Sequence, residues 1–260
     1  MPGSQPNLSS IFTPRLNTLE PDIAEIGTVY MQSLYNEIIK WLQKRATEGP
    51  IGVCFSGGID SGSVFLLTYH AMVQLGLNPA RLKAFTLSVD GGGEDLSQAQ
   101  HFLKSLGLSL FWETIEVSQD EINWQETIRI VEDYKLLDIQ AATMNLALCR
   151  GIRRRYPGWH YLIDGDRGDE NLTNYPIEEN PELTIRSVLN NMMLYQEGWG
   201  VDSIKHSSTY SGGLSKSYTR TYAPASMFDF EGFSPYTLPN VIEIAEAIPF
   251  IALTNWSRDK

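Results

Sequence analysis

The sequence is poor in cysteine and in basic residues. Its 260 residues include two cysteines, Cys54 and Cys149, and neither belongs to a Cys-x-x-Cys arrangement. We therefore expect no zinc site and no disulfide framework, and we predict that both are small core residues. There are 20 Lys and Arg against 31 Asp and Glu, a formal net charge of −11. Because nucleic-acid binding depends on Lys and Arg that neutralise phosphates, we expect no nucleic-acid partner.

Long hydrophobic runs are also missing. No stretch approaches eighteen consecutive apolar residues, and the segment Met1–Pro6 lacks the basic and apolar regions of a signal peptide. We therefore expect a cytoplasmic protein with no membrane partner. A content of 42% hydrophobic and 11% aromatic residues is typical of a globular chain with a sizeable core.

The most informative stretch runs from Ile51 to Ser63. An apolar run of strand length is followed by the turn Ser56-Gly57-Gly58 and then directly by a helix-length apolar segment. The free N–H groups of such a turn converge on a site that fits a phosphate, and Asp60 could hold Mg²⁺ against it. The alternative is an ordinary helix N-terminus in which Asp60 and Ser61 only cap orphan amides. The stretch is not a Walker A loop, because it has no Gly-Lys-Ser/Thr ending.

Strands and helices alternate along the chain. The pattern predicts strands at 51–55, 84–89, 109–117 and 159–164. It predicts helices at 21–45, from the Ser-Gly-Gly turn to about 75, at 95–106, from a capping box at Ser118–Glu121 onward, at 138–155 and at 181–196. This order implies an α/β fold with a parallel β-sheet flanked by helices. We expect an extended lead-in at 1–20, a nucleotide-binding domain at 21–170 that includes an N-terminal helix, and a helical substrate-side region at 171–260, which could be incomplete.

A second informative stretch is Asp164-Gly-Asp-Arg-Gly-Asp-Glu170, which directly follows a predicted strand. Four carboxylates within it would repel one another unless a cation lies between them; the alternative is a solvated acidic turn. The ends of parallel strands lie at one edge of a sheet, so this turn and the Ser-Gly-Gly turn would face the same site. Together they predict a Mg²⁺ site.

These two stretches carry a family resemblance. The first resembles the pyrophosphate loop (PP-loop) of the ATP pyrophosphatases. The second is similar, position for position, to the motif Ser-Gly-Glu-Gly-Ala-Asp-Glu of the synthetase domain of asparagine synthetase and β-lactam synthetase. Weaker resemblances lie at 131–138, 232–241 and 247–249, so that the likeness covers roughly residues 30 to 255. It implies an adenine nucleotide α-hydrolase-like (HUP-type) fold, with ATP and Mg²⁺ as cofactors and with release of AMP and pyrophosphate.

The resemblance also implies a role for individual residues. Ser56, Gly57, Gly58 and Ser61 would hold pyrophosphate, and Asp60 and Asp169 would bind the metal. The backbone from Leu87 to Val89 would line the adenine pocket, and Gly165 would lie beside the nucleotide. Asp166 takes the place of a catalytic Glu or Tyr, and either Lys216 or Lys260 would stabilise the transition state of the acyl-adenylate. Three positions depart from the family pattern: Gly62 replaces a Ser, Arg167 replaces a Gly, and Asp166 is one methylene shorter than Glu.

The implied reaction is amide formation by a ligase. A carboxylate attacks the α-phosphorus of ATP, and ammonia or an amine then attacks the acyl-adenylate. Position 2 is Pro rather than the nucleophilic Cys of a glutaminase domain, and about fifty residues precede the loop. We therefore expect nitrogen from free ammonia, a separate amidotransferase subunit or an amine, and specialised metabolite assembly rather than housekeeping asparagine synthesis; a homo-oligomer is a further possibility.

Three questions stay open at this point. One alternative is a PP-loop sulfur transferase or tRNA-modifying enzyme, and another is a non-catalytic nucleotide-binding regulatory protein. The basic, glycine-rich segment Tyr210–Arg220 could contact phosphate or a carboxylate substrate, or it could be a solvated loop.

Overall fold

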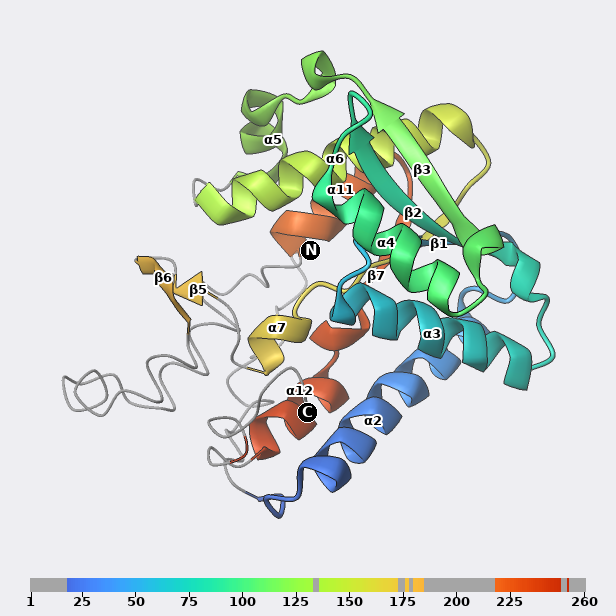
Figure 1. Cartoon of the computed structure of the whole chain (residues 1–260), viewed down its shortest axis with the longest axis vertical. Helices are drawn as coiled ribbons and strands as arrows, with labels where there is room; N and C mark the ends of the chain where they lie inside the picture. Colours follow the sequence, from blue (N-terminus) through green and yellow to red (C-terminus); the bar gives the residue numbers. More distant parts are fainter. Residues whose placement is uncertain are drawn as a thin grey trace, which may run out of the picture.

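A parallel β-sheet forms the centre of the molecule (Figure 1). The computed structural model describes residues 18–132, 136–172, 176–177, 180–184, 218–248 and Ala252. Within them, five strands lie in the order β3-β2-β1-β4-β7, and every neighbouring pair is parallel. The strands are β1 (Ile51–Cys54), β2 (Leu82–Val89), β3 (Trp112–Val117), β4 (Tyr161–Ile163) and β7 (Glu231–Phe233). The predicted α/β class with a parallel sheet is thus confirmed.

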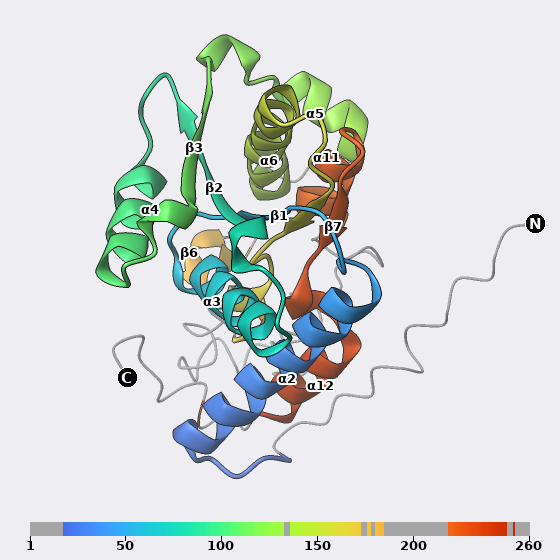
Figure 2. The same ribbon diagram turned by 90° about the vertical axis from the view of Figure 1, so that its right-hand side faces the viewer.

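Helices cover both faces of this sheet (Figure 2). One face is covered by α2 (Ile23–Lys44), α3 (Ile59–Gln74), α4 (Glu94–Ser105) and α12 (Pro239–Ala247). The other is covered by α5 (Trp124–Val131), α6 (Leu136–Arg155) and α11 (Ala223–Ser226). Successive strand residues point to opposite faces, so that Ala84 packs in the first layer and Phe85 in the second. The sheet is therefore buried on both sides, as parallel sheets are.

Short elements connect these layers. They are η1 (Pro79–Arg81), η2 (Ser109–Phe111), η3 (Gln119–Glu121), α7 (Gly168–Asn171), β5 (Pro176–Ile177), β6 (Asn180–Thr184), η4 (Tyr218–Tyr222) and η5 (Pro235–Thr237). The described part of the chain has no helix with the length and apolarity that crossing a membrane requires.

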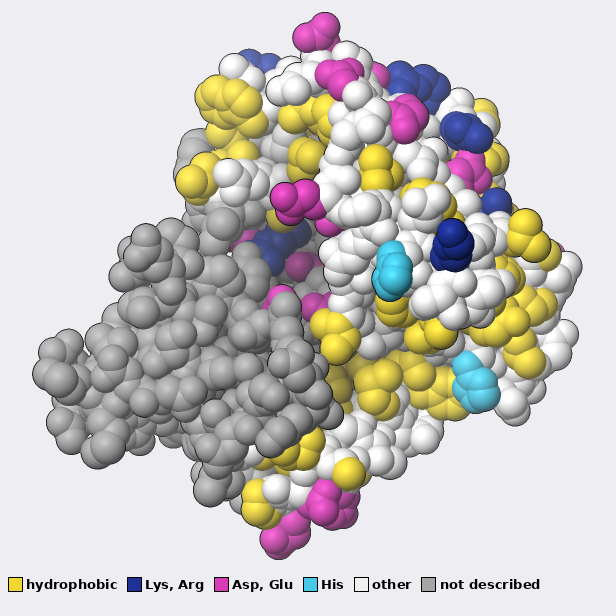
Figure 3. All heavy atoms as spheres, in the orientation of Figure 1, with side chains coloured by type: hydrophobic (Ala, Val, Ile, Leu, Met, Phe, Trp, Pro, Cys, Tyr) yellow, Lys and Arg dark blue, Asp and Glu magenta, His cyan; other side chains and the backbone are white. Residues whose placement is uncertain are grey.

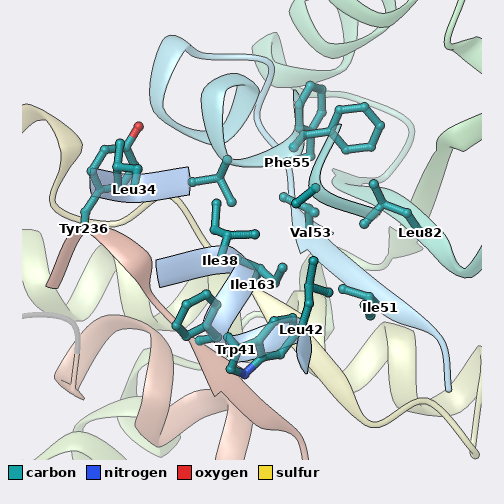
Figure 4. Packing of buried hydrophobic residues seen from close by; sticks show 14 of the residues in the cluster. Leu34, Ile38, Trp41, Leu42, Ile51, Val53, Phe55, Leu82, Ile163 and Tyr236 are labelled. Carbon is teal, nitrogen blue, oxygen red and sulfur yellow. The ribbon is translucent and has the colours of Figure 1, made fainter. Parts of the chain in front are cut away.

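The apolar stripe of α2 anchors the first layer (Figure 4). Asp22 caps the helix by accepting hydrogen bonds from the N–H groups of Ala24 and Glu25, at 2.8 and 3.0 Å. Farther along the helix, the ring of Trp41 stacks on that of Phe233 in β7, with centroids 4.7 Å apart and an angle of 2° between the planes. The predicted helix α2 thus packs on β7, the strand that the C-terminal part of the chain contributes to the sheet.

Two predicted helices differ from what the structure shows. The capping box of Ser118 and Glu121 is present, but it closes the single turn η3, and α5 begins only at Trp124 with Asn123 as its own cap. The reason is that Ile122 is extended, at φ −82° and ψ 100°, which ends the first turn. The helix predicted at 181–196 is wrong at its start, because Asn180–Thr184 is strand β6, antiparallel to β5. Pro181 is tolerated there because an edge strand need not donate every N–H. The remainder of that segment lies outside the described residues.

The strand β7 was not predicted. It belongs to the region at 171–260, which was expected to be helical, and its three residues are too few for an alternating pattern to be recognised. It hydrogen-bonds along β4 and completes the sheet. The chain leaves β1 toward β2 on one side, while β4 lies on the other, so the gap between the ends of β1 and β4 is a topological switch point. Ligands of open α/β sheets bind at such a point.

Candidate active site

The turn after β1 is held closed by two serine hydroxyls. We call residues 55–61 the Ser-Gly-Gly loop. The hydroxyl oxygens of Ser56 and Ser61 lie 3.2 Å apart, and Ser61 Oγ also accepts the N–H of Ser56 at 3.3 Å. Ser56 Oγ accepts the N–H of Gly58 at 3.2 Å. These contacts curl the loop over the N-terminus of α3, where helix amides and the helix dipole favour an anion.

Two glycines let α4 approach the loop closely. Gly57 has φ +80°, and a Cβ atom there would lie 2.5 Å from the backbone nitrogen of Ala99. The side chain of Gln98 donates to the carbonyl of Gly57 at 3.2 Å. At Gly62 a Cβ atom would lie 2.8 Å from the ring of Phe102. The departure at Gly62 therefore has a steric reason, because the aromatic ring fills the space that a serine side chain would need.

The second motif packs directly on this loop. We call residues 164–170 the acidic turn. A Cβ atom at Gly165 would lie 2.7 Å from the backbone nitrogen of Ser61, and one at Gly168 would lie 2.2 Å from Cγ and Oδ1 of Asp60. The carboxylate of Asp60 thus lies against the residue that precedes Asp169. The two predicted motifs, which are more than a hundred positions apart in the sequence, form one site.

The side chain of Tyr236 lies beside both carboxylates. Its hydroxyl donates to the backbone carbonyl of Asp60 at 3.4 Å. Burial raises the pKa of Tyr236, and the charges of Asp60 and, less strongly, Asp169 raise it further. Asn171 fixes the backbone of Tyr236 by donating to its carbonyl at 2.9 Å.

The donor set suits a magnesium ion that is also bound by phosphates. Among the described residues, no group of three or more His, Cys, Asp or Glu converges as a complete metal site. Mg²⁺ is commonly held by one or two carboxylates and by substrate phosphate oxygens, with water completing the octahedron. Asp60 and Asp169 fit this pattern, since both are hard oxygen donors beside the packed Ser-Gly-Gly loop and acidic turn.

A pocket opens beside the loop, toward β2 and α6. It has a volume of about 640 Å³, which falls in the range of small-molecule sites. Its walls include Ser56, Leu87 and Val89, three of the residues predicted to bind nucleotide. The other residues that line the pocket were not among the predicted site residues. They are Cys54, Phe55, Phe85, Gly92, Gly93, Glu94, Asp95, Gln119, Met144, Asn145 and Leu148. On the face shown in Figure 3 the surface is hollowed, and acidic side chains lie in and around the hollow together with a basic one.

The acidic turn includes buried charged groups, and Arg220 and Asp138 lie against it. Asp164 is 6% exposed and accepts hydrogen bonds from Ser234 Oγ at 2.6 Å and from the N–H of Asp166 at 3.0 Å. Burial, and next the charge of Asp166, raise the pKa of Asp164 to about 7. Arg220 forms ion pairs with Asp138 and with Asp166. None of Asp138, Arg220 and Ser234 was among the predicted site residues, and Arg220 was considered only as the end of a basic segment.

Replacing Asp164 by asparagine is expected to change how stability depends on pH. The folded-state pKa of about 7 exceeds the reference value of 3.8, so from about pH 4 to 7 the folded protein retains a proton that the unfolded chain releases. Stability from this group therefore falls as pH rises through that window. From pH 5 to pH 8 the free energy of unfolding of Asp164→Asn should rise relative to wild type by about 2 to 3 kcal/mol.

Urea unfolding at both pH values, without nucleotide or metal, measures this difference. The control is Asp120→Asn, which changes an exposed side chain. A difference between Asp164→Asn and wild type that stays constant with pH would contradict the expectation.

Three further residues named in the sequence analysis are Arg167, Lys216 and Lys260, and the structure describes only the first of them. Arg167 has φ +79°, a left-handed conformation that suits the glycine expected there, and its side chain is 1% exposed. Lys216 and Lys260 both lie outside the described residues, so the choice between them stays as it was.

The two cysteines lack the features of reactive thiols. Cys54 in β1 lies at the pocket wall, and Cys149 in α6 is buried. Burial raises the pKa of Cys149 to about 12 and raises that of Cys54 well above its ordinary value. Burial therefore disfavours the thiolate, which is the nucleophilic form of cysteine, at both positions.

Comparison with known proteins agrees with the geometry. A sequence model of the asparagine synthase family matches residues 42–223. The chain is also similar to glutamine-hydrolysing asparagine synthetase 1 of Lotus japonicus, with 30% identity over 142 residues. The aligned part is 52% of this chain and 23% of that protein, so the chain spans only a fraction of the relative. The family match covers well over half of the chain and includes both motifs that meet in the site, and this chain therefore belongs to the asparagine synthase family.

Proposed function

We propose that this chain is an ATP-dependent ligase that adenylates a small carboxylate, releases pyrophosphate, and forms an amide with ammonia or an amine. Membership of the asparagine synthase family supports ATP binding and amide formation in general. The observation that carries the proposal is the direct packing of the acidic turn on the Ser-Gly-Gly loop at Gly168 and Asp60. The pocket of about 640 Å³ that Ser56 lines supports a nucleotide site beside this packed pair of motifs.

In the first step, an oxygen of the substrate carboxylate attacks the α-phosphorus of ATP, and the bond to the β-phosphate breaks. The loop amides, with the hydroxyls of Ser56 and Ser61, would hold the leaving pyrophosphate. Leu87 and Val89 would contact the adenine. A magnesium ion held by Asp60 and Asp169 would supply neutralisation of the charge on the phosphates. Positioning and electrostatic stabilisation account for most of the catalysis of phosphoryl and nucleotidyl transfer.

In the second step, the amine nitrogen attacks the acyl carbon, AMP leaves, and the nitrogen loses a proton. Asp166 would lie beside the reacting group, and one of its oxygens is available to accept that proton. Lys216 or Lys260 would stabilise the negative charge that develops during acyl transfer. We further propose that the region at 171–260 carries substrate specificity and that the region at 21–170 binds nucleotide.

The reaction is tested by incubating the protein with ATP, Mg²⁺, ammonium chloride and a panel of carboxylic acids. The first acid in the panel is L-aspartate, because the similar Lotus japonicus protein is an asparagine synthetase. Small carboxylates with and without an amino group follow, since specialised chemistry is the favoured expectation. The expected products are AMP and pyrophosphate, measured by ³¹P NMR. With a carboxylate labelled with ¹⁸O, one labelled oxygen should appear in AMP, because the adenylate passes it to phosphorus.

Other outcomes would point elsewhere. Formation of ADP and phosphate would reject the assignment. Binding of ATP in calorimetry without turnover on the panel would favour a regulatory protein. The double variant Cys54→Ser, Cys149→Ser should keep full activity, and loss of turnover with intact ATP binding would instead support sulfur transfer.

A further inference from the structure

A buried arginine joins two carboxylates from different parts of the chain. Arg220 lies in η4, and its side chain is 5% exposed. Its Nε donates to Oδ1 of Asp138 in α6, and its Nη1 lies 3.5 Å from Oδ1 of Asp166 in the acidic turn. The side chain of Asp138 is 2% exposed. The guanidinium therefore links a helix on one face of the sheet to a predicted catalytic residue.

The helix α6 fixes both the side chain and the backbone of this arginine. Asn145 donates from Nδ2 to the carbonyl of Arg220 at 2.8 Å, while Asp138 binds its guanidinium. The two α6 residues are seven positions apart, close to two helical turns, and so lie on one face. Because the planar guanidinium donates in fixed directions, an arginine anchored in this way imposes a direction on any further carboxylate that it binds.

The ion pairs leave one oxygen of Asp166 unused. Oδ2 of Asp166 is buried and has no hydrogen-bond partner among the described residues, whereas Oδ1 faces Arg220. Leaving a buried acceptor unsatisfied is unfavourable, and more so for a charged group. Asp164 also places a carboxyl group close to Asp166. Buried acceptors without a partner are rare in native structures, so this unsatisfied oxygen indicates a functional constraint.

We propose that Arg220, anchored by Asp138, is a positioning residue that orients Asp166 for the acyl-transfer step. This inference rests on the proposed function. Asp166 is one methylene shorter than the glutamate of the family motif, so its reach depends on where the carboxylate is held. By binding Oδ1, Arg220 fixes the carboxylate and leaves Oδ2 for the reacting group. The same pair, Asp138 and Arg220, links η4 to α6.

Crystal structures of wild type, Asp138→Asn and Arg220→Lys test the orienting role without any substrate. Asp138→Asn keeps the shape of the side chain but removes its charge, and Arg220→Lys replaces the fork of donors by a single point charge. We expect the Asp166 carboxylate to turn away from its wild-type position in both variants. An unchanged Asp166 in both structures would overturn the inference.

Kinetics then test whether this orientation matters for the reaction. On the acid that the panel identifies, Asp138→Asn and Arg220→Lys should lower kcat by about 10- to 100-fold, because small misplacements of reacting groups are costly. The KM for ATP should change by less than about twofold, since nucleotide binding involves other residues. The control is Arg150→Gln, which removes another α6 arginine, paired with Glu126 at 2.7 Å. It should keep wild-type kcat.

A double-mutant cycle separates positioning from general stability. In an Asp166→Asn background, Asp138→Asn should cause little further loss, because the group that it positions is already disabled. Additive losses would show that Asp138 acts independently of Asp166 and would overturn the inference. If wild type is active and both variants keep its kcat, the inference fails while the proposed function stands. If wild type forms no AMP with any acid, the proposed function fails, and the crystal structures alone decide whether Arg220 orients Asp166.

Discussion

Replacing Asp60 by asparagine is expected to lower the rate of AMP formation by at least about 100-fold. The substitution keeps the size of the side chain and removes a charge next to Gly168 and the acidic turn. Even indirect supports of metal ligands are worth 10- to 100-fold, and removing a ligand that neutralises phosphate charge should cost more. Asp169→Asn should have a similar effect. The rate of pyrophosphate release at saturating ATP measures both.

The matched control is Asp120→Asn, an exposed aspartate that belongs to neither motif, which should keep wild-type activity. Raising the Mg²⁺ concentration should partly restore Asp60→Asn and Asp169→Asn if the loss reflects weakened metal binding. Full activity of both variants at limiting Mg²⁺ would contradict their assignment as ligands. Calorimetry with Mg·ATP provides a second readout, in which affinity should fall for both.

Replacing Gly57 by alanine is expected to destabilise the fold by about 3 kcal/mol. A Cβ atom there would lie 2.5 Å from the backbone nitrogen of Ala99, and the clash cannot be relieved by turning a side chain. Overpacking of this kind costs about 1 to 3 kcal/mol, and the left-handed conformation at φ +80° adds about 1 to 2 kcal/mol. Either α4 or the loop must move. Urea unfolding gives the change in free energy.

The matched control is Gly76→Ala. Gly76 also has a positive φ, +67°, but nothing lies within 4 Å of the position that its Cβ atom would take. It should therefore show only the conformational cost of about 1 to 2 kcal/mol. Equal destabilisation by the two variants would mean that the approach of α4 to the loop does not constrain Gly57.

Local patterns predicted most of the fold. The apolar run at 51–55, the Ser-Gly-Gly turn and the helix after it lie within one continuous stretch, and the structure has β1, the loop and α3 there. The stripe of α2 was predicted for the same reason, because its apolar spacing is local. Elements with only a few informative residues were predicted less accurately. The three residues of β7 are too few to show an alternating pattern, and the capping box at Ser118 marks where a helix begins but not how far it continues.

In the candidate site, too, local features could be predicted and contacts between distant segments could not. The residues of the two motifs were predicted because each motif is contiguous, and the parallel sheet explained why both lie at one edge. The pair of Arg220 and Asp138 could not be predicted, since these residues are 82 positions apart and neither belongs to the Ser-Gly-Gly loop or the acidic turn. The steric reason for Gly62 is equally nonlocal, because the ring of Phe102 comes from another helix. Contacts between distant segments are what a single sequence leaves open.

The late position of β7 in the chain has a consequence for biosynthesis. The strand β4 pairs with β7, and Asp164 receives its hydrogen bond from Ser234, which is 70 positions later. At about 5 to 20 residues per second, a ribosome needs about 4 to 14 s to make the intervening segment. During that time β4 is an unpaired edge, open to association with other nascent chains. Slowing translation between these strands should therefore increase aggregation, whereas slowing it after residue 248 should not.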